Sequence, residues 1–179
     1  MVRYIALLRG INVGGNNKIA MQELKAGFEA LGFEQVVTHL NSGNVIFSAN
    51  DEKDYELTEA IKGMIQSKFA LEIPVLIIPQ EEVVELLREA PTWWGSEDKE
   101  IYDNLIFLYP DLSFEEFLQE VGVPNETYEK VQQGKQAVFW SFIRQEKQKT
   151  NWWTKTATAR IRQKITIRTA NTVRKIAEL

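Results

Sequence analysis

Two short polar segments hold the residues whose types and spacing could bind a charged ligand. The first runs from Arg9 to Lys18 and contains three glycines, three asparagines and a cation at each end. The second is Asn41-Ser42-Gly43-Asn44, in which two amides flank a Ser-Gly pair. Backbone N–H groups of a glycine-rich turn before a helix can point at an anion, and arginine and lysine add positive charge. The two segments are therefore candidates for binding phosphate or carboxylate.

The first segment does not complete a known nucleotide-binding motif. Gly10 and Gly15 have the separation found in a P-loop, but Asn16 replaces the required lysine and no Ser or Thr follows it. The pattern is not G-x-G-x-x-G either. An alternative role is structural, in which the glycines permit a tight connection and the asparagines satisfy backbone groups or cap the next helix.

The second segment is typical of a hairpin turn, which explains Ser42-Gly43 better than it explains the two amides. In a split βαβ unit the first strand is central and has the third strand as a neighbour. We therefore hypothesise that Arg9 and Asn44 lie near each other. A shared ligand site and a mutual hydrogen-bond network are both consistent with this placement.

Catalytic side chains are scarce in this chain. It has no cysteine and one histidine, His39, which excludes thiolate chemistry and multi-histidine metal sites. His39 could act as a general base, but its position favours a surface or half-buried strand residue. Ser42 lacks the sequence of a nucleophile elbow. We identify no catalytic residue, no metal site and no cofactor.

The elements that must position these residues follow from apolar periodicity and turn signals. We expect strands at residues 3–8, 35–40, 45–47, 74–78, 104–109, 127–132, 136–143 and 165–168. We expect helices at residues 21–31, 54–69, 80–90, 114–121, 152–162 and 170–178, with Ser113 capping the fourth.

The order β-α-β-β-α-β therefore occurs twice. It predicts an α/β (α+β) fold of two ferredoxin-like βαββαβ subdomains with mainly antiparallel sheets and a C-terminal helix. We expect the first subdomain at residues 1–80, a connecting helix and loop at 81–102, and the second subdomain with the terminal helix at 103–179. No flexible linker separates them, so we expect one compact unit.

Charge is uneven along the chain. Residues 144–179 carry ten Lys or Arg and two Asp or Glu, although the whole chain has a net charge of −4. This basic segment also contains Trp152-Trp153, and aromatics among cations can bind nucleic acid. Pairing with the acidic remainder of the fold is the favoured explanation, because acidic partners are abundant within the chain. Nucleic-acid binding is not favoured, because no RNP-type motif is present and Val138, Trp140 and Phe142 alternate like core residues.

Several motifs together resemble the signature of a widespread bacterial family catalogued as a domain of unknown function. The matching residues are Arg9 to Gly15, Lys18, Met21, Leu24, Asn41 to Asn44, Pro91, Trp93, Trp94, Thr166, Arg168, Thr172 and Lys175. Thr169 departs from the pattern, because the family usually has Asn there. The resemblance implies two intertwined ferredoxin-like subdomains and no established activity.

The favoured interpretation is a cytoplasmic protein that binds a small anionic molecule through the two loops. An enzyme acting on a phosphorylated or carboxylated metabolite, and a nucleic-acid or protein interaction module using the basic segment, are the alternatives. No signal peptide or membrane span is evident, and the sequence does not specify the oligomeric state. The candidate ligand-binding residues are Arg9, Asn12, Gly14, Gly15, Asn17, Lys18, Asn41, Ser42, Asn44 and Arg168.

Overall fold

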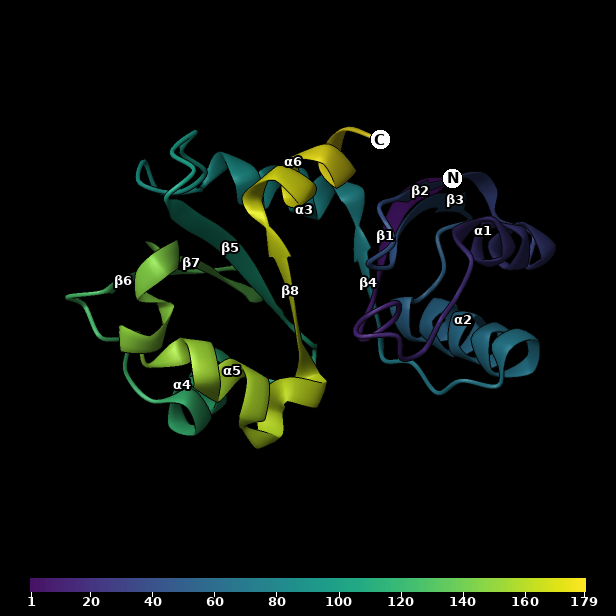
Figure 1. Cartoon of the computed structure of the whole chain (residues 1–179). Coiled ribbons are helices and arrows are strands. Elements are labelled where there is room, and N and C mark those ends of the chain that lie inside the picture. The colour runs from purple at the N-terminus through teal and green to yellow at the C-terminus, as the bar shows by residue number, and fades with distance from the viewer. The chain divides into compact units, whose positions relative to one another are not determined.

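The structure, a computed structural model, describes all residues, 1–179. The chain divides into two compact units (Figure 1). Unit 1 contains Met1–Val84 together with Ile176–Leu179, and unit 2 contains Glu85–Lys175. Each unit has its own sheet and its own helices.

Unit 1 contains a four-stranded antiparallel sheet in the order β2-β3-β1-β4. Its elements are β1 (Val2–Leu8), α1 (Met21–Ala30), β2 (Glu34–His39), β3 (Asn44–Ala49), α2 (Asp54–Phe69) and β4 (Val75–Pro79). The two helices pack against each other and against the sheet, as Figure 1 shows. This strand order and connectivity are those of the predicted ferredoxin-like subdomain.

The core of unit 1 forms because apolar side chains recur at helical spacing and along the central strands. Leu57, Ile61 and Ile65 of α2 are fully buried. Phe28 of α1 contacts Phe47 of β3 edge-on, with ring centroids 5.3 Å apart. Burial of each such side chain contributes roughly 1.5–3 kcal/mol, which holds the helices over the sheet.

Unit 2 repeats the topology with the strand order β6-β7-β5-β8, again antiparallel. Its strands and the helices between them are β5 (Ile101–Leu108), α4 (Phe114–Val121), β6 (Glu129–Gly134), β7 (Ala137–Ile143), η1 (Arg144–Lys149), α5 (Trp152–Thr158), η2 (Arg160–Lys164) and β8 (Ile165–Thr169). Val138, Trp140 and Phe142 are buried in its core with Trp152, as their alternation predicted. Ser113 caps α4 by accepting a hydrogen bond from Glu116 N.

Two further helices each contain residues of both units. They are α3 (Gln80–Arg88) and α6 (Ala170–Glu178). The last four residues complete unit 1, because the Arg3 guanidinium donates to the Leu179 carbonyl oxygen at 2.9 Å. The Gln80 amide likewise donates to the Ile176 carbonyl oxygen at 2.9 Å.

The bounds of several expected elements differ from those observed, and two of these differences have a structural cause. β5 begins at Ile101 rather than at residue 104, because Ile101 and Tyr102 pair with the end of β7. The helix expected at 152–162 is interrupted at Ala159, whose backbone is extended, and continues as the short helix η2. The threonines of this segment favour helices only weakly, which is consistent with the break.

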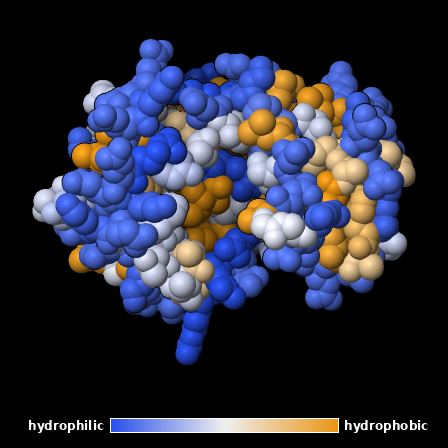
Figure 2. All heavy atoms as spheres, viewed as in Figure 1, coloured by the Kyte–Doolittle hydropathy of each residue, from blue (hydrophilic) through white to orange (hydrophobic).

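On the face shown in Figure 2, most surface atoms belong to hydrophilic residues, as expected when apolar side chains collect in cores. None of the helices combines the length and apolar character that crossing a bilayer requires.

Candidate functional site

The glycines of the first loop form a tight turn. Val13 and Asn16 make an isolated antiparallel bridge, closed by a hydrogen bond from Asn16 N to the Val13 carbonyl oxygen at 3.0 Å. Gly14 and Gly15 between them have φ of 58° and 79°, which is typical of a two-residue turn of type I′. The glycine pair is therefore required by backbone geometry.

Asn12 joins the two loops. Its side-chain nitrogen donates to the Asn41 carbonyl oxygen at 2.8 Å and to the Ile19 carbonyl oxygen at 3.0 Å. Its side-chain oxygen accepts from Ile19 N at 2.9 Å. Both amide protons are therefore used within the fold, so that Asn12 positions the site and has no proton left to donate to a ligand.

The side chains of Asn17 and Asn44 also bond to backbone. Asn17 donates to the Gly10 carbonyl oxygen at 2.9 Å. Asn44, which is fully buried, donates to the His39 carbonyl oxygen at 3.0 Å and to Ser42 Oγ at 3.1 Å. The bond of Asn17 closes the first loop and those of Asn44 close the β2–β3 hairpin, which agrees with the predicted structural alternative.

Arg9 and Asn44 lie at the same end of the sheet, as hypothesised. Leu7 pairs with Asn44 in the β1–β3 ladder, and Leu8 N donates to the Gly43 carbonyl oxygen at 2.8 Å. Arg9 follows directly and is half-buried, with its own N–H bonded to the Pro74 carbonyl oxygen at 3.0 Å. The two loops therefore leave the sheet side by side.

A pocket of about 470 Å³ opens between these loops, and we call it the loop pocket. It is lined by Asn12, Gly15, Lys18, Ile19, Ala20, Met21 and Asn41. Four of the candidate residues are thus brought together, namely Asn12, Gly15, Lys18 and Asn41. Arg9, Gly14, Asn17, Ser42 and Asn44 belong to the same loops but are not part of the lining.

The lining includes the start of α1, which sequence reasoning did not include in the site. Ala20 occupies the N-cap position and supplies no side-chain hydrogen bond. The N–H groups of Met21, Gln22 and Glu23 have no intramolecular acceptor. An alanine where capping residues are preferred was a signal in the sequence that this helix start is open.

Arg168 belongs to unit 2 and has partners within β8. Its guanidinium donates to Thr166 Oγ1 at 2.8 Å and to the Ile167 carbonyl oxygen at 3.0 Å. Thr169 takes over a capping role at α6, because its hydroxyl accepts a hydrogen bond from Thr172 N at 3.4 Å. Asparagine at this position could cap in the same way, which accounts for the departure from the family pattern.

The structure also shows the surroundings of the residues that were considered for catalysis or metal binding. His39 is half-buried on β2, as predicted, and its imidazole makes no hydrogen bond. No three His, Asp or Glu side chains are grouped so that they could hold a metal ion.

The basic segment makes several cation–π contacts inside unit 2. The Arg144 guanidinium lies 4.3 Å from the centroid of the Tyr102 ring, and the Lys147 ammonium lies 4.8 Å from that of Trp153. Trp152 is fully buried. Internal packing therefore explains part of the association of aromatic and basic residues noted in the sequence.

Comparison with known proteins gives a fold and a family. A search of curated proteins finds no match. A solved structure of conserved bacterial protein SP0830 from Streptococcus pneumoniae is similar, with a TM-score of 0.85 and 29% identity over 99% of this chain and 97% of that one. The family described as "Protein of unknown function (DUF1697)" matches residues 1–139, which include both signature loops. The chain therefore belongs to this family of proteins of unknown function, and no specific activity comes with that membership.

Proposed function

We propose that the protein binds a small anionic molecule, carrying a phosphate or carboxylate group, in the loop pocket. The observation that carries this proposal is the open N-terminus of α1 beside Lys18 in a pocket of about 470 Å³. Ligand pockets in proteins typically have volumes of about 300–1,000 Å³, so this pocket is large enough for a small metabolite.

The electrostatics of the pocket favour an anion. The N–H groups at the start of a helix carry a partial positive charge, and those of α1 have no acceptor in the protein. Lys18 adds a full positive charge and is exposed to solvent. Glu23 lies in the first turn of α1 and opposes this field, so that the affinity for an anion depends on Lys18.

The hydrogen bonds of Asn12 support binding by fixing the pocket before a ligand arrives. They connect the lining residues Ile19 and Asn41, which come from different loops. A preformed pocket avoids the entropy cost of ordering loops on binding. Asn12 therefore acts as a positioning residue for the anion site.

Thermal-shift measurements and calorimetry with inorganic phosphate and with succinate test this proposal, against sodium chloride at equal ionic strength. We expect both anions to stabilise the wild-type protein, and Lys18→Gln to weaken their binding by about tenfold. The matched control is Lys25→Gln, because Lys25 is also exposed but lies further along α1 and pairs with Glu29. Equal binding by wild type and Lys18→Gln, or no binding at millimolar anion, would overturn the proposal.

A further inference from the structure

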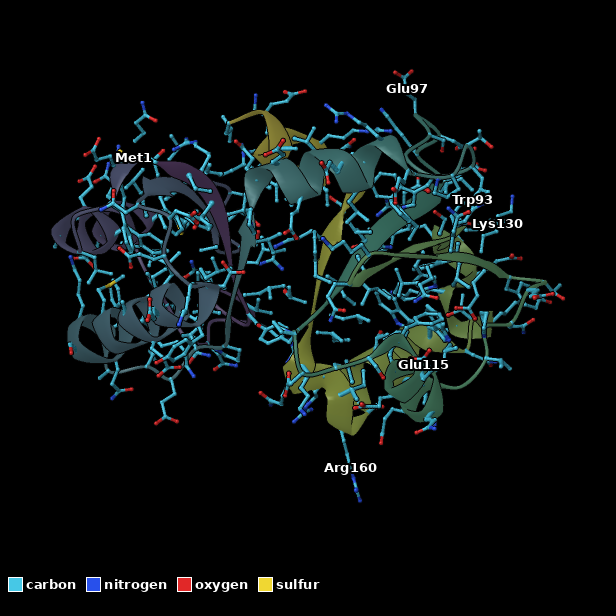
Figure 3. All side chains as sticks on the ribbon, turned by 180° about the vertical axis from the view of Figure 1, so that it is seen from behind. Met1, Trp93, Glu97, Glu115, Lys130 and Arg160 are labelled. Atoms are coloured by element: carbon cyan, nitrogen blue, oxygen red, sulfur yellow. The ribbon has the colours of Figure 1, made fainter.

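Unit 2 contains a second cavity, of about 280 Å³, which we call the tryptophan pocket. Trp93, Ile101, Tyr128, Lys130, Ser141 and Ile143 are among its lining residues. It lies at the end of the sheet where β5 begins and β7 ends, because Ile101 and Ile143 are antiparallel partners there. In Figure 3, Trp93 and Lys130 lie next to each other at this end.

Trp93 differs from the other four tryptophans in having no partner within the fold. Trp94, Trp140 and Trp152 each donate their indole N–H to an oxygen of the protein. Trp153 contacts Phe142 edge-on, and the Lys147 ammonium lies over its ring. Trp93 is half-buried, yet its ring contacts no other aromatic ring and its N–H has no acceptor. A large, half-buried aromatic side chain whose N–H has no acceptor in the protein is typical of a binding surface.

The floor of the tryptophan pocket is apolar. Ile101 and Ile143 pair across β5 and β7, and Ile143 is 43% exposed although it lies in a strand. Phe142 also contributes to the lining. An exposed apolar strand residue beside a partnerless tryptophan gives a planar molecule two surfaces from which it can displace water.

The two exposed charged side chains of the lining balance each other. Glu126 and Lys130 have opposite charges, and neither makes an ion pair. The buried Glu129 carboxylate is already occupied, since it accepts hydrogen bonds from Trp140 Nε1, Asn125 N and Asn151 N. Ser141 donates its proton to Asp103 and so presents only acceptor lone pairs. These surroundings favour a neutral ligand over an ion.

We propose that the tryptophan pocket binds a neutral, planar molecule of one or two fused rings that bears a hydrogen-bond acceptor. The ring system packs on the isoleucine pair with one edge against the Trp93 indole, and the acceptor on that edge takes the indole N–H of Trp93. The volume of about 280 Å³ lies at the lower end of the range for ligand pockets, which limits the ligand to this size. Every residue involved belongs to unit 2, so the proposal is independent of the loop pocket.

Titration of the full-length, ¹⁵N-labelled protein with quinoline and with indole tests the proposal by NMR. The two bicyclic probes are similar in size, but only quinoline has an acceptor nitrogen. We expect saturable shifts of the Trp93 indole N–H signal, with quinoline binding about fivefold more tightly than indole. The adjacent Trp94 indole, which is buried and bonded to the Asn104 carbonyl oxygen, serves as the internal control and should not move.

Two variants, followed through the backbone amide signals of Ile101 and Ile143, separate ring contact from hydrogen bonding. Trp93→Phe should reduce quinoline binding about fivefold and leave indole binding nearly unchanged, and Trp93→Ala should abolish both. Trp153→Phe, which alters a tryptophan outside the pocket, should bind both probes like the wild type. Unshifted indole signals of Trp94, Trp140 and Trp152 verify that each variant is folded. Binding by a folded Trp93→Ala variant as tight as in the wild type, or no shift of the Trp93 signal at saturating quinoline, would overturn the assignment.

Discussion

The side-chain amide of Asn12 donates a hydrogen bond to the carbonyl oxygen of Asn41 over 2.8 Å, although 29 residues separate the two in sequence. This bond joins the glycine turn that follows β1 to the turn between β2 and β3. The same amide also donates to the Ile19 carbonyl oxygen and accepts a hydrogen bond from Ile19 N. One asparagine therefore determines how the two signature loops meet.

Replacement of Asn12 by alanine should destabilise unit 1. Because the variant loses three hydrogen bonds and leaves backbone groups partly unsatisfied, we expect the free energy of unfolding to fall by about 2 kcal/mol. All five tryptophans belong to unit 2, so amide hydrogen exchange in unit 1 is a better measurement than tryptophan fluorescence.

Two controls separate the hydrogen bonds of Asn12 from its backbone strain. Asn16→Ala removes an exposed amide of the same turn that makes no side-chain bond, and should change stability by less than about 0.5 kcal/mol. Asn12 has φ of 54°, so Asn12→Gly relieves strain but still loses the bonds. We expect Asn12→Gly to remain less stable than the wild type, and a variant more stable than the wild type would mean that the relief of strain outweighs the bonds.

Gly43→Ala should be strongly destabilising. Gly43 has φ of 91°, and a methyl group there would lie 2.7 Å from Leu8 Cβ and 3.0 Å from the Leu8 carbonyl oxygen. We expect a loss of about 3 kcal/mol from strain and overlap combined, measured by hydrogen exchange of β1 and β3 amides. Gly63→Ala, in the exposed interior of α2 with open space around it, should instead stabilise the protein by about 0.5–1 kcal/mol. Similar effects of the two substitutions would contradict this explanation.

Glu129→Gln should destabilise unit 2. The Glu129 carboxylate accepts three N–H groups, from Trp140 Nε1 at 2.9 Å, Asn125 N at 2.8 Å and Asn151 N at 2.6 Å. An amide at this position turns one acceptor into a donor that faces other donors, which should cost about 2–4 kcal/mol. Urea unfolding followed by tryptophan fluorescence measures the change. Glu120→Gln on the exposed side of α4 should have almost no effect, and equal losses in the two variants would refute the role of Glu129.

The exposed ion pair of Lys164 with Asp111 should be visible as a pH effect. The hydrogen bond from Lys164 to Asp111, 2.9 Å long, raises the pKa of Lys164 above its ordinary value of 10.5. Because the folded-state pKa is the higher one, the stabilising effect is complete below pH 10.5 and is lost as the pH rises through the raised value. NMR titration of the Lys164 side chain should show the pKa return toward 10.5 in Asp111→Asn.

Glu116→Gln provides the comparison for this titration. Glu116 raises the pKa of Lys164 less than Asp111 does, because it acts only through its negative charge. Asp111 acts through its charge and also accepts a hydrogen bond from Lys164. We expect the pKa of Lys164 to fall less in Glu116→Gln than in Asp111→Asn. A larger effect of Glu116 would mean that long-range charge, and not the hydrogen bond, controls the titration.

Much of the fold could be predicted because apolar side chains repeat along the sequence with the spacing of helices and strands. The expected helix at 54–69 coincides with α2, since Leu57, Ile61 and Ile65 repeat at helical spacing. The break at Ala159 was not predicted, because it depends on backbone geometry within a segment whose residues tolerate a helix. Local patterns therefore defined the type of each element better than its ends.

The candidate site was predictable only in part. Asn12, Gly15, Lys18 and Asn41 do line one pocket, and their polar chemistry made them visible in the sequence. Ala20 and Met21 were missed because they contribute backbone N–H groups and shape, and neither side chain is reactive. The long-range bond of Asn12 could not be predicted, since spacing in sequence does not determine which carbonyl group an amide meets.

The inclusion of residues 176–179 in unit 1 has a consequence for protein synthesis. A ribosome makes residues 1–84 first, but the carbonyl groups of Ile176 and Leu179, which accept bonds from Gln80 and Arg3, are made more than ninety residues later. Unit 2 is one continuous segment, so all of its residues are synthesised before the last residues of unit 1. The unit that starts first is thus completed last, and an expression fragment that ends at residue 84 lacks a part of its own fold.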